Sequence, residues 1–343
     1  MGIPVFLSAT NLDAPIIAAI MASICSNTKS EFNFYIIDGF LSYANRKKLD
    51  ACSKFFNNFT IEFIRMDLRV WIKKYPELSN FDKCALTKFA LPTLRPGLDR
   101  AIVIDKDIIF LEGVDIENLF QTDLRKFMLA AVPLATMLGD GLWSKKKLEN
   151  FAKLGLSSRT AVFDAGLMLI DVRKWNQRKT TDELLNITKE LINEQRLFES
   201  YDGLFKLIDG QYMKLDKSWS VPYHYAKLFY FGKKFGQEDM RAIHYNYNGD
   251  NNKPWNNKEL EGASYFWKYV KLTMFKYSLE HNPPSRIHDP QYWAKLKYRR
   301  KIINIIIKCL VNKKRYKKFK NNTEEFFADS KNRFICFLGE IYF

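Results

Sequence analysis

The feature of this sequence that restricts its fold most is a regular alternation of strand-like and helix-like segments in the first half of the chain. Short apolar runs at residues 3–8, 32–38 and 60–66 are predicted strands, and the segments between them have the composition of helices. One predicted helix covers residues 14–25, and a second runs from Ser42 to Phe55 with Ser42 as its N-cap. Alternating units of this kind predict a mostly parallel sheet with helices on both faces.

The pattern continues and then changes near residue 260. A helix is expected at residues 83–92, strands near 128–133 and 166–171, and an amphipathic helix near 181–195. Beyond residue 260 the sequence becomes helical, rich in Lys and aromatic residues, and carries a hinge at Pro283 and Pro284. We therefore expect an α/β domain over residues 1–260 and a helical, basic appendage over residues 261–343.

The stretch "AIVIDKDIIFL" is the most informative part of the chain for function. An apolar strand delivers Asp105 to its carboxyl end, which is where open α/β sheets bind ligands. Asp105 and Asp107 are two residues apart, so in an extended segment both carboxylates leave on the same face. Two carboxylates on one face suit Mg²⁺ or Mn²⁺. A polar turn between two strands is the alternative interpretation.

A second group of candidate ligands lies in "AIHYNYNGDNNKPW". His244 follows a short apolar run, so it is also expected at a strand end, and imidazole is a good ligand for Mn²⁺. Gly249 allows an anion to approach the backbone closely, and Lys253 can meet a phosphate as a point charge. A histidine with only a structural role is the alternative.

Several ordered segments resemble glycosyltransferase family 8, the retaining enzymes that include bacterial lipopolysaccharide galactosyl- and glucosyltransferases. "FYIIDGFLSYANRKKL" resembles the second strand and following helix of the family. "FDAGLMLIDVRKW" resembles its "FNAGVLLINLKKW" signature, and "HYNYNGDNNKPW" resembles its His-x-x-Gly-x-x-Lys-Pro-Trp ending. The resemblance covers about residues 3–258. It implies the α/β GT-A fold, with a mixed, mostly parallel central sheet, and a UDP-sugar donor.

The resemblance also implies roles for individual residues. Asp105, Asp107 and His244 would ligate Mn²⁺ (or Mg²⁺), and Gly249 and Lys253 would meet the donor diphosphate. The complete set of candidates for contact with the donor nucleotide is Ser8, Thr10, Asn11, Lys88, Asp105, Lys106, Asp107, Gly249 and Lys253. Asp164, Tyr201 and Asp202 are candidates for contact with the transferred sugar or its developing positive charge. The structural alternative is a buried turn for Asp164, packing for Tyr201 and a helix N-cap for Asp202.

The sequence departs from the family pattern at several positions, and Asp164, Ser200 and Tyr201 among them are donor-sugar positions. Lys88 replaces a common Arg and loses its bidentate geometry, Asp164 replaces the Asn of the signature, and Ser200 and Tyr201 replace two residues of an Asp-Gln-Asp motif. These changes leave open a second hypothesis, a degenerate relative that binds sugar nucleotide without turnover. They also leave the identity of the sugar undetermined.

The net charge of +16 is concentrated in one segment. Residues 295–320 contain 12 Lys or Arg and no acidic residue, which leaves 42 basic and 38 acidic side chains elsewhere. The central "IINIIIKCLV" is too short to span a bilayer but suits a helix lying on an anionic membrane surface. Nucleic-acid binding is the competing hypothesis, and it lacks a recognisable motif. A solvated helical face is the third alternative.

The cellular location follows from three features taken together. The start of the chain lacks the basic region of a signal peptide, and the five cysteines are scattered without a CxxC pair. With the basic segment, this predicts a cytoplasmic protein attached peripherally to the inner face of the cytoplasmic membrane. The expected partners are a UDP-sugar, a glycan or glycolipid acceptor such as lipopolysaccharide core, and anionic lipid; nucleic acid is not expected.

Overall fold

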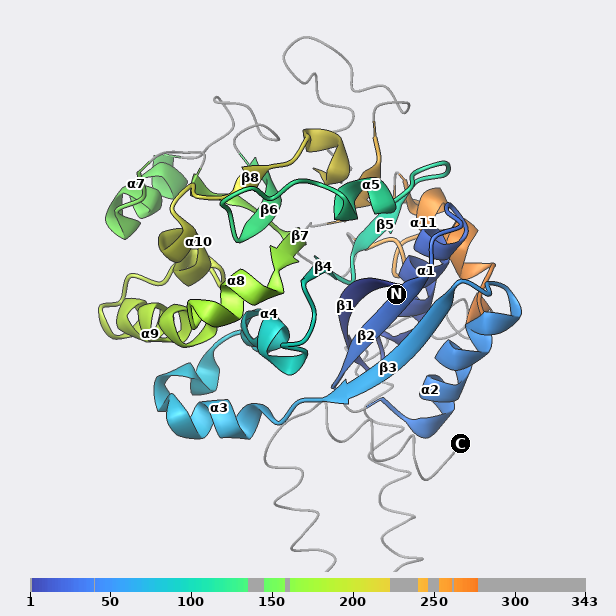
Figure 1. Cartoon of the computed structure of the whole chain (residues 1–343), viewed down its shortest axis with the longest axis horizontal. Helices are drawn as coiled ribbons and strands as arrows, with labels where there is room; N and C mark the ends of the chain where they lie inside the picture. The colour runs from blue at the N-terminus through green and yellow to red at the C-terminus, as the bar shows by residue number, and fades with distance from the viewer. Residues whose placement is uncertain are drawn as a thin grey trace, which may run out of the picture.

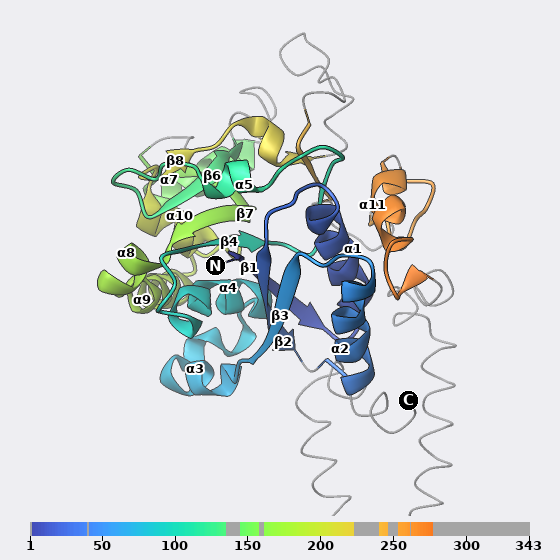
Figure 2. The ribbon, with the colours of Figure 1, turned by 45° about the vertical axis from the view of Figure 1, so that its right-hand side comes forward.

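A mixed sheet of seven strands runs through the middle of the molecule, and helices pack on both of its faces (Figures 1 and 2). The computed structural model describes residues 2–39, 41–134, 145–157, 161–222, 240–245, 253–260 and 262–276. In spatial order the strands are β3 (Phe59–Arg65), β2 (Phe32–Gly39), β1 (Ile3–Thr10), β4 (Arg100–Ile104), β7 (Phe163–Asp171), β6 (Leu129–Pro133) and β8 (Met213–Lys214).

Most neighbouring strands in this sheet are parallel. The pairs β3–β2, β2–β1, β1–β4 and β6–β8 are parallel, whereas β7 is antiparallel to both of its neighbours, β4 and β6. The predicted mostly parallel sheet covered by helices is therefore confirmed. The antiparallel direction of β7 was not predicted, because a strand that is buried on both faces carries the same apolar pattern in either direction.

The helices divide between the two faces of the sheet. Figures 1 and 2 agree in placing α1, α2 and α11 on one side and α4, α8 and α9 on the other. The bounds are α1 (Ala14–Cys25), α2 (Tyr43–Asp50), α3 (Leu68–Lys74), α4 (Lys83–Leu94), α5 (Glu117–Phe120), α7 (Lys145–Leu154), α8 (Val172–Gln177), α9 (Thr180–Asn193), α10 (Asp202–Ile208) and α11 (Ala263–Val270), with 3₁₀ helices η1 (Ala51–Lys54), η2 (Pro76–Asn80) and η4 (Lys217–Trp219).

Each face of the sheet has its own hydrophobic core, because successive side chains of a strand point to opposite faces. Val5 and Leu7 of β1 pack into the core shared with α1, whereas Phe6 between them packs into the core shared with α4 and α9. The expected helix after β2 is confirmed as α2 continued by η1. The Ser42 hydroxyl caps it by accepting a hydrogen bond from the Asn45 amide at 3.2 Å.

A second, small sheet lies where β4 ends. Its order is β5 (Ile108–Phe110), β10 (Ala242–His244) and β9 (Val221–Pro222), with β10 antiparallel to β5 and parallel to β9. The backbone leaves the large sheet at Asp105 and enters the small sheet at Ile108. The acidic turn between them therefore joins the two sheets.

Helix α11 packs against α1, although it lies beyond the expected domain boundary at residue 260. Phe266 and Val270 belong to the same core as α1, and the Asn27 amide at the end of α1 donates hydrogen bonds to the Leu111 carbonyl (2.8 Å) and the Tyr269 hydroxyl (3.1 Å). The rest of the expected appendage, residues 277–343, lies outside the described residues. None of the described helices has the length and apolar character needed to cross a membrane.

We predict that Asn27→Ala lowers the free energy of unfolding by about 1–3 kcal/mol, because it leaves buried polar partners without a hydrogen bond. Thermal or urea unfolding measures this change. Asn57→Ala in an exposed loop is the matched control, and it should change stability by less than about 0.5 kcal/mol. Equal effects of the two substitutions would show that Asn27 does not hold α11 and the turn after β5 against α1.

Candidate functional site

Three side chains with metal-binding atoms converge at the junction of the two sheets. One ligand atom each from Asp105, Asp107 and His244 lies within 4.8 Å of the others. Asp105 follows the carboxyl end of β4, Asp107 precedes β5, and His244 ends β10. The three residues predicted as metal ligands are therefore neighbours in space. Two hard carboxylates and one imidazole form a donor set that suits Mn²⁺ or Mg²⁺ better than a soft thiophilic metal.

The pairing of β10 with β5 brings the histidine to the carboxylates. His244 lies opposite Ile108 in the antiparallel register, and the Tyr245 amide donates to the Asp107 carbonyl at 2.8 Å. As a result the His244 Nε2 atom lies 3.2 Å from Asp107 Oδ1. The backbone ladder of the small sheet thus fixes the position of the imidazole.

Asp164 holds the other side of the His244 ring. Its Oδ2 lies 2.8 Å from His244 Nδ1 and also accepts a hydrogen bond from the Ser220 hydroxyl, while its Oδ1 accepts from the Gly166 amide at 2.8 Å. A carboxylate on Nδ1 leaves Nε2 directed toward the metal position, as is usual for metal-binding histidines. Asp164 was a candidate for contact with the sugar, with a buried turn as the alternative, and its contacts with His244, Ser220 and Gly166 favour a positioning role.

Gly166 gives the imidazole room. A Cβ atom on Gly166 would lie 2.5 Å from His244 Cε1 and 3.0 Å from Asp164 Oδ1. Any side chain here would force the ring to move. The glycine in the middle of β7 is therefore required by the close approach of His244.

Two lysines neutralise the carboxylates of the cluster. Lys88, a buried residue of α4, donates to Asp105 at 2.6 Å and to the Ala165 carbonyl at 2.8 Å. Lys253 lies 2.6 Å from Asp107 Oδ2 and also donates to the Tyr245 carbonyl. Two of the three lysines predicted to contact the donor, Lys88 and Lys253, thus lie at the cluster, each beside one of the two aspartates.

The close charges shift the pKa values in opposite directions. Burial alone would lower the pKa of His244, but the Asp164 and Asp107 carboxylates raise it to about 10. Burial raises the pKa of Asp105 in spite of Lys88. Burial also acts to raise the pKa of Asp107, but the positive charges of His244 and Lys253 hold this pKa well below its usual value. Without a metal, the imidazole therefore carries a proton and pairs with two carboxylates.

The candidates on β1 lie at the same edge of the sheet. The Asn11 side chain accepts from the Ser42 amide at 2.8 Å, and Thr10 donates through its hydroxyl to Asp13 at 2.7 Å. Lys106 donates to the same Asp13 carboxylate at 2.8 Å. Asp13 therefore joins the end of β1 to the acidic turn.

Among the remaining candidates, Tyr201 is near the cluster. The Lys88 Nζ atom lies 5.0 Å from the centre of the Tyr201 ring, and burial raises the pKa of the Tyr201 hydroxyl. Asp202 is fully buried, and its carboxylate accepts the amides of Phe198 (2.7 Å) and Glu199 (2.8 Å). These contacts give Asp202 a structural role at the start of α10. Ser8 is half-buried near the carboxyl end of β1.

Sequence reasoning did not find Asp13, Gly166 or Ser220. Gly166 offered a signal, since a glycine inside an apolar strand often marks a close approach of another group. Asp13 and Ser220 gave no such signal, because Lys106 and Asp164, which tie them to the site, come from distant segments. Gly249 lies outside the described residues.

Comparisons of this chain with family models and with curated proteins point to the same family. Residues 4–259 match the model of Glycosyl transferase family 8. General stress protein A of Bacillus subtilis is 26% identical over 194 residues, which are 56% of this chain and 63% of that protein. Glycosyltransferase 8 domain-containing protein 1 of Rattus norvegicus is 24% identical over 311 residues, 81% of this chain and 80% of that protein.

Solved structures share the fold. The bifunctional glycosyltransferase WbbM in its apo form has a TM-score of 0.66 at 18% identity, over 82% of this chain and 51% of WbbM. The galactosyltransferase LgtC in complex with donor and acceptor sugar analogs has a TM-score of 0.61 at 18% identity, over 79% of this chain and 96% of LgtC.

We predict that Gly166→Ala weakens Mn²⁺ binding by roughly 10- to 100-fold, because the added methyl group displaces the His244 ring. Titration calorimetry with Mn²⁺ measures the loss. Gly97→Ala is the matched control, since a Cβ atom there has no neighbour within 4 Å. Unchanged Mn²⁺ affinity in Gly166→Ala would show that His244 is not a ligand in this protein.

Proposed function

The chain belongs to glycosyl transferase family 8, and on this premise we propose that it transfers a hexosyl group from a UDP-sugar to a hydroxyl of a glycan acceptor. The observation that carries the proposal is the cluster of Asp105, Asp107 and His244 with Lys253 beside it. We further propose that the anomeric configuration is retained, in keeping with the family resemblance. The acceptor would be a glycan or glycolipid such as lipopolysaccharide or lipooligosaccharide core.

Asp105, Asp107 and His244 would hold Mn²⁺ or Mg²⁺, which supplies Lewis-acid charge to the leaving diphosphate when bound. Lys253 would exchange its contact with Asp107 for a phosphate oxygen and add a point charge there. Lys88 would keep Asp105 ionised and in place. Asp164 would act through His244, as a positioning residue.

The proposed reaction needs no separate protein base. The bond between the anomeric carbon and the phosphate oxygen breaks while a bond to the acceptor oxygen forms on the same face of the sugar. The proton of the acceptor hydroxyl passes to the leaving phosphate oxygen. Tyr201, next to Lys88 and Asp105, is the described aromatic candidate for contact with the donor sugar.

We predict Mn²⁺-dependent hydrolysis of one member of a panel of UDP-sugars, and a decrease of roughly 10³-fold in the Asp105→Ala, Asp107→Ala double variant. Chelation of the metal should abolish the same activity. A thermal unfolding curve of the variant shows whether its fold is intact.

The two alternatives give different results in this experiment. A degenerate relative would bind UDP with Mn²⁺ yet hydrolyse none of the sugars. If no UDP-sugar binds or reacts, the donor assignment is wrong, and the acid pair is a turn between two strands.

Attachment to an anionic membrane surface through residues 295–320 is the second part of the proposal. This segment lies outside the described residues, so its sequence alone supports the assignment, together with a location on the cytoplasmic face of the membrane. Twelve basic side chains around a short apolar stretch fit binding to anionic lipid.

We predict that the full chain sediments with vesicles containing anionic lipid, and that deletion of residues 291–343 abolishes this. Neutral vesicles are the control, and added salt should weaken the binding. A steep salt-dependent affinity for DNA or RNA without vesicle binding would support the nucleic-acid hypothesis instead.

A further inference from the structure

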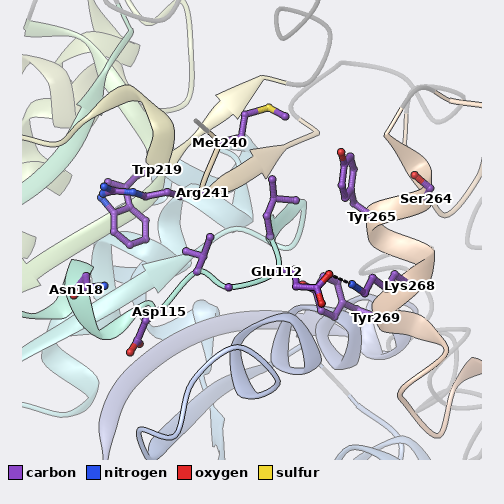
Figure 3. Close-up of a pocket in the computed structure, with 13 residues that line it drawn as sticks. Glu112, Asp115, Asn118, Trp219, Met240, Arg241, Ser264, Tyr265, Lys268 and Tyr269 are labelled. Carbon is purple, nitrogen blue, oxygen red and sulfur yellow. Dashed lines mark hydrogen bonds and ion pairs between the residues drawn. The ribbon is translucent and has the colours of Figure 1, made fainter. Parts of the chain in front are cut away.

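An open hollow of about 890 Å³ lies at the end of the small sheet opposite to the metal ligands (Figure 3). Three parts of the chain line it: the turn after β5 with the start of α5 (residues 111–118), the residues around Trp219 and Arg241 next to β9 and β10, and one side of α11. None of the residues assigned to the donor site is among them. The function proposed above therefore leaves this hollow unexplained.

Hydrogen bonds from Asn27 hold the walls of the hollow in place. The Asn27 side chain binds the Leu111 carbonyl (2.8 Å), the Gly113 amide (3.1 Å) and the Tyr269 hydroxyl (3.1 Å). Gly113 has a positive φ of 77°, which a glycine adopts without strain. The turn and α11 are thus fixed relative to each other before any ligand binds, which lowers the entropic cost of binding.

The charges in the hollow balance. Glu112 of the turn is paired with Lys268 of α11, and the Arg241 guanidinium lies 4.8 Å from the centre of the Trp219 ring. Together with Asp115, the lining therefore offers two basic and two acidic groups. The carboxylates of Glu112 and Asp115 would repel a diphosphate, and the side chains of Lys268 and Arg241 would repel a cation. This balance favours an uncharged ligand that both donates and accepts hydrogen bonds.

The polar groups of the hollow can exchange partners with a ligand at little cost. The side chains of Glu112 and Lys268 are 79% and 49% exposed, and ion pairs this exposed contribute little to stability. Asn118 is exposed as well and adds an amide with both a donor and an acceptor. Figure 3 shows the ring of Tyr265 on α11 facing the same space.

We propose that this hollow is a second, non-catalytic binding site for a neutral saccharide. The hydroxyl groups of a sugar both donate and accept hydrogen bonds, and its C–H faces pack against an aromatic ring such as that of Tyr265. The inference rests on the proposed function in one respect: we assign the saccharide to a part of the acceptor glycan away from the reacting hydroxyl.

The distance to the metal ligands supports a non-catalytic role. Three residues of β5 separate Leu111 at the hollow from Asp107, and two residues of β10 separate Arg241 from His244. At about 3.3 Å per residue, the two ends of this ladder are roughly 10 Å or more apart. A sugar in the hollow is therefore not the one that reacts.

The test is saturation-transfer NMR on the full chain with maltohexaose and a neutral galacto-hexasaccharide, and with a hyaluronan hexasaccharide as the acidic comparison. We expect saturable binding of a neutral hexasaccharide. Ser264→Trp on α11 fills the hollow and should weaken this binding about tenfold or more. Ser53→Trp, at an exposed position outside the hollow, is the matched control and should bind like the wild type.

Two further variants separate this inference from the proposed function. Asn118→Ala removes an exposed amide from the lining, so it should weaken saccharide binding even if Ser264→Trp were to fold poorly. The Asp105→Ala, Asp107→Ala variant should bind the saccharide normally while losing hydrolysis of UDP-sugar. Absence of binding by both neutral hexasaccharides, stronger binding of hyaluronan, or unchanged binding in both lining variants would overturn the inference, whatever the result with UDP-sugars.

Discussion

Three carboxylates, those of Asp105, Asp107 and Asp164, share the edge where the two sheets meet, and their mutual repulsion is the constraint on which the site depends. Burial of an unpaired carboxylate costs several kcal/mol, so each must be matched by a cation or by hydrogen-bond donors. Lys88 serves Asp105, Lys253 serves Asp107, and His244 lies between Asp107 and Asp164. The cluster is therefore balanced in charge without a metal, with three acids and three bases.

This balance has a consequence for the bound state. The same Nε2 atom of His244 and the same oxygens of Asp107 that would ligate a metal are occupied by a proton and by Lys253. If the cluster binds a metal as we propose, that proton would be released and Lys253 would be freed beside the place of the donor diphosphate. Binding of the proposed metal would then favour binding of the proposed anionic donor, and the reverse.

The sequence predicted the parts of this arrangement that are local. An apolar strand ending in Asp105 and Asp107 has a pattern within ten residues, and Ser42 caps its own helix. The direction of β7 and the contacts of Asp164 could not be predicted, because they join distant segments: Asp164 and His244 are 80 residues apart, and Asp164 and Ser220 are 56 apart. Asp202 differs, because the amides that donate to its carboxylate, those of Phe198 and Glu199, are only four and three residues away.

In the small sheet, the pairing of β5 with β10 links the position of His244 at one end to that of Arg241 at the other. At one end the Tyr245 amide binds the Asp107 carbonyl, and at the other the Leu111 amide binds the Arg241 carbonyl at 2.9 Å. With only three residues in each strand, a shift of β10 along β5 would move His244 away from Asp107 and also move Arg241 in the hollow. Because a change of register by one residue would also turn the buried Ile243 outward, the ladder has one favourable position. The geometry of the proposed metal ligands and that of the hollow are therefore set by the same backbone hydrogen bonds, so a glycan bound as we propose would meet two sites at a fixed spacing.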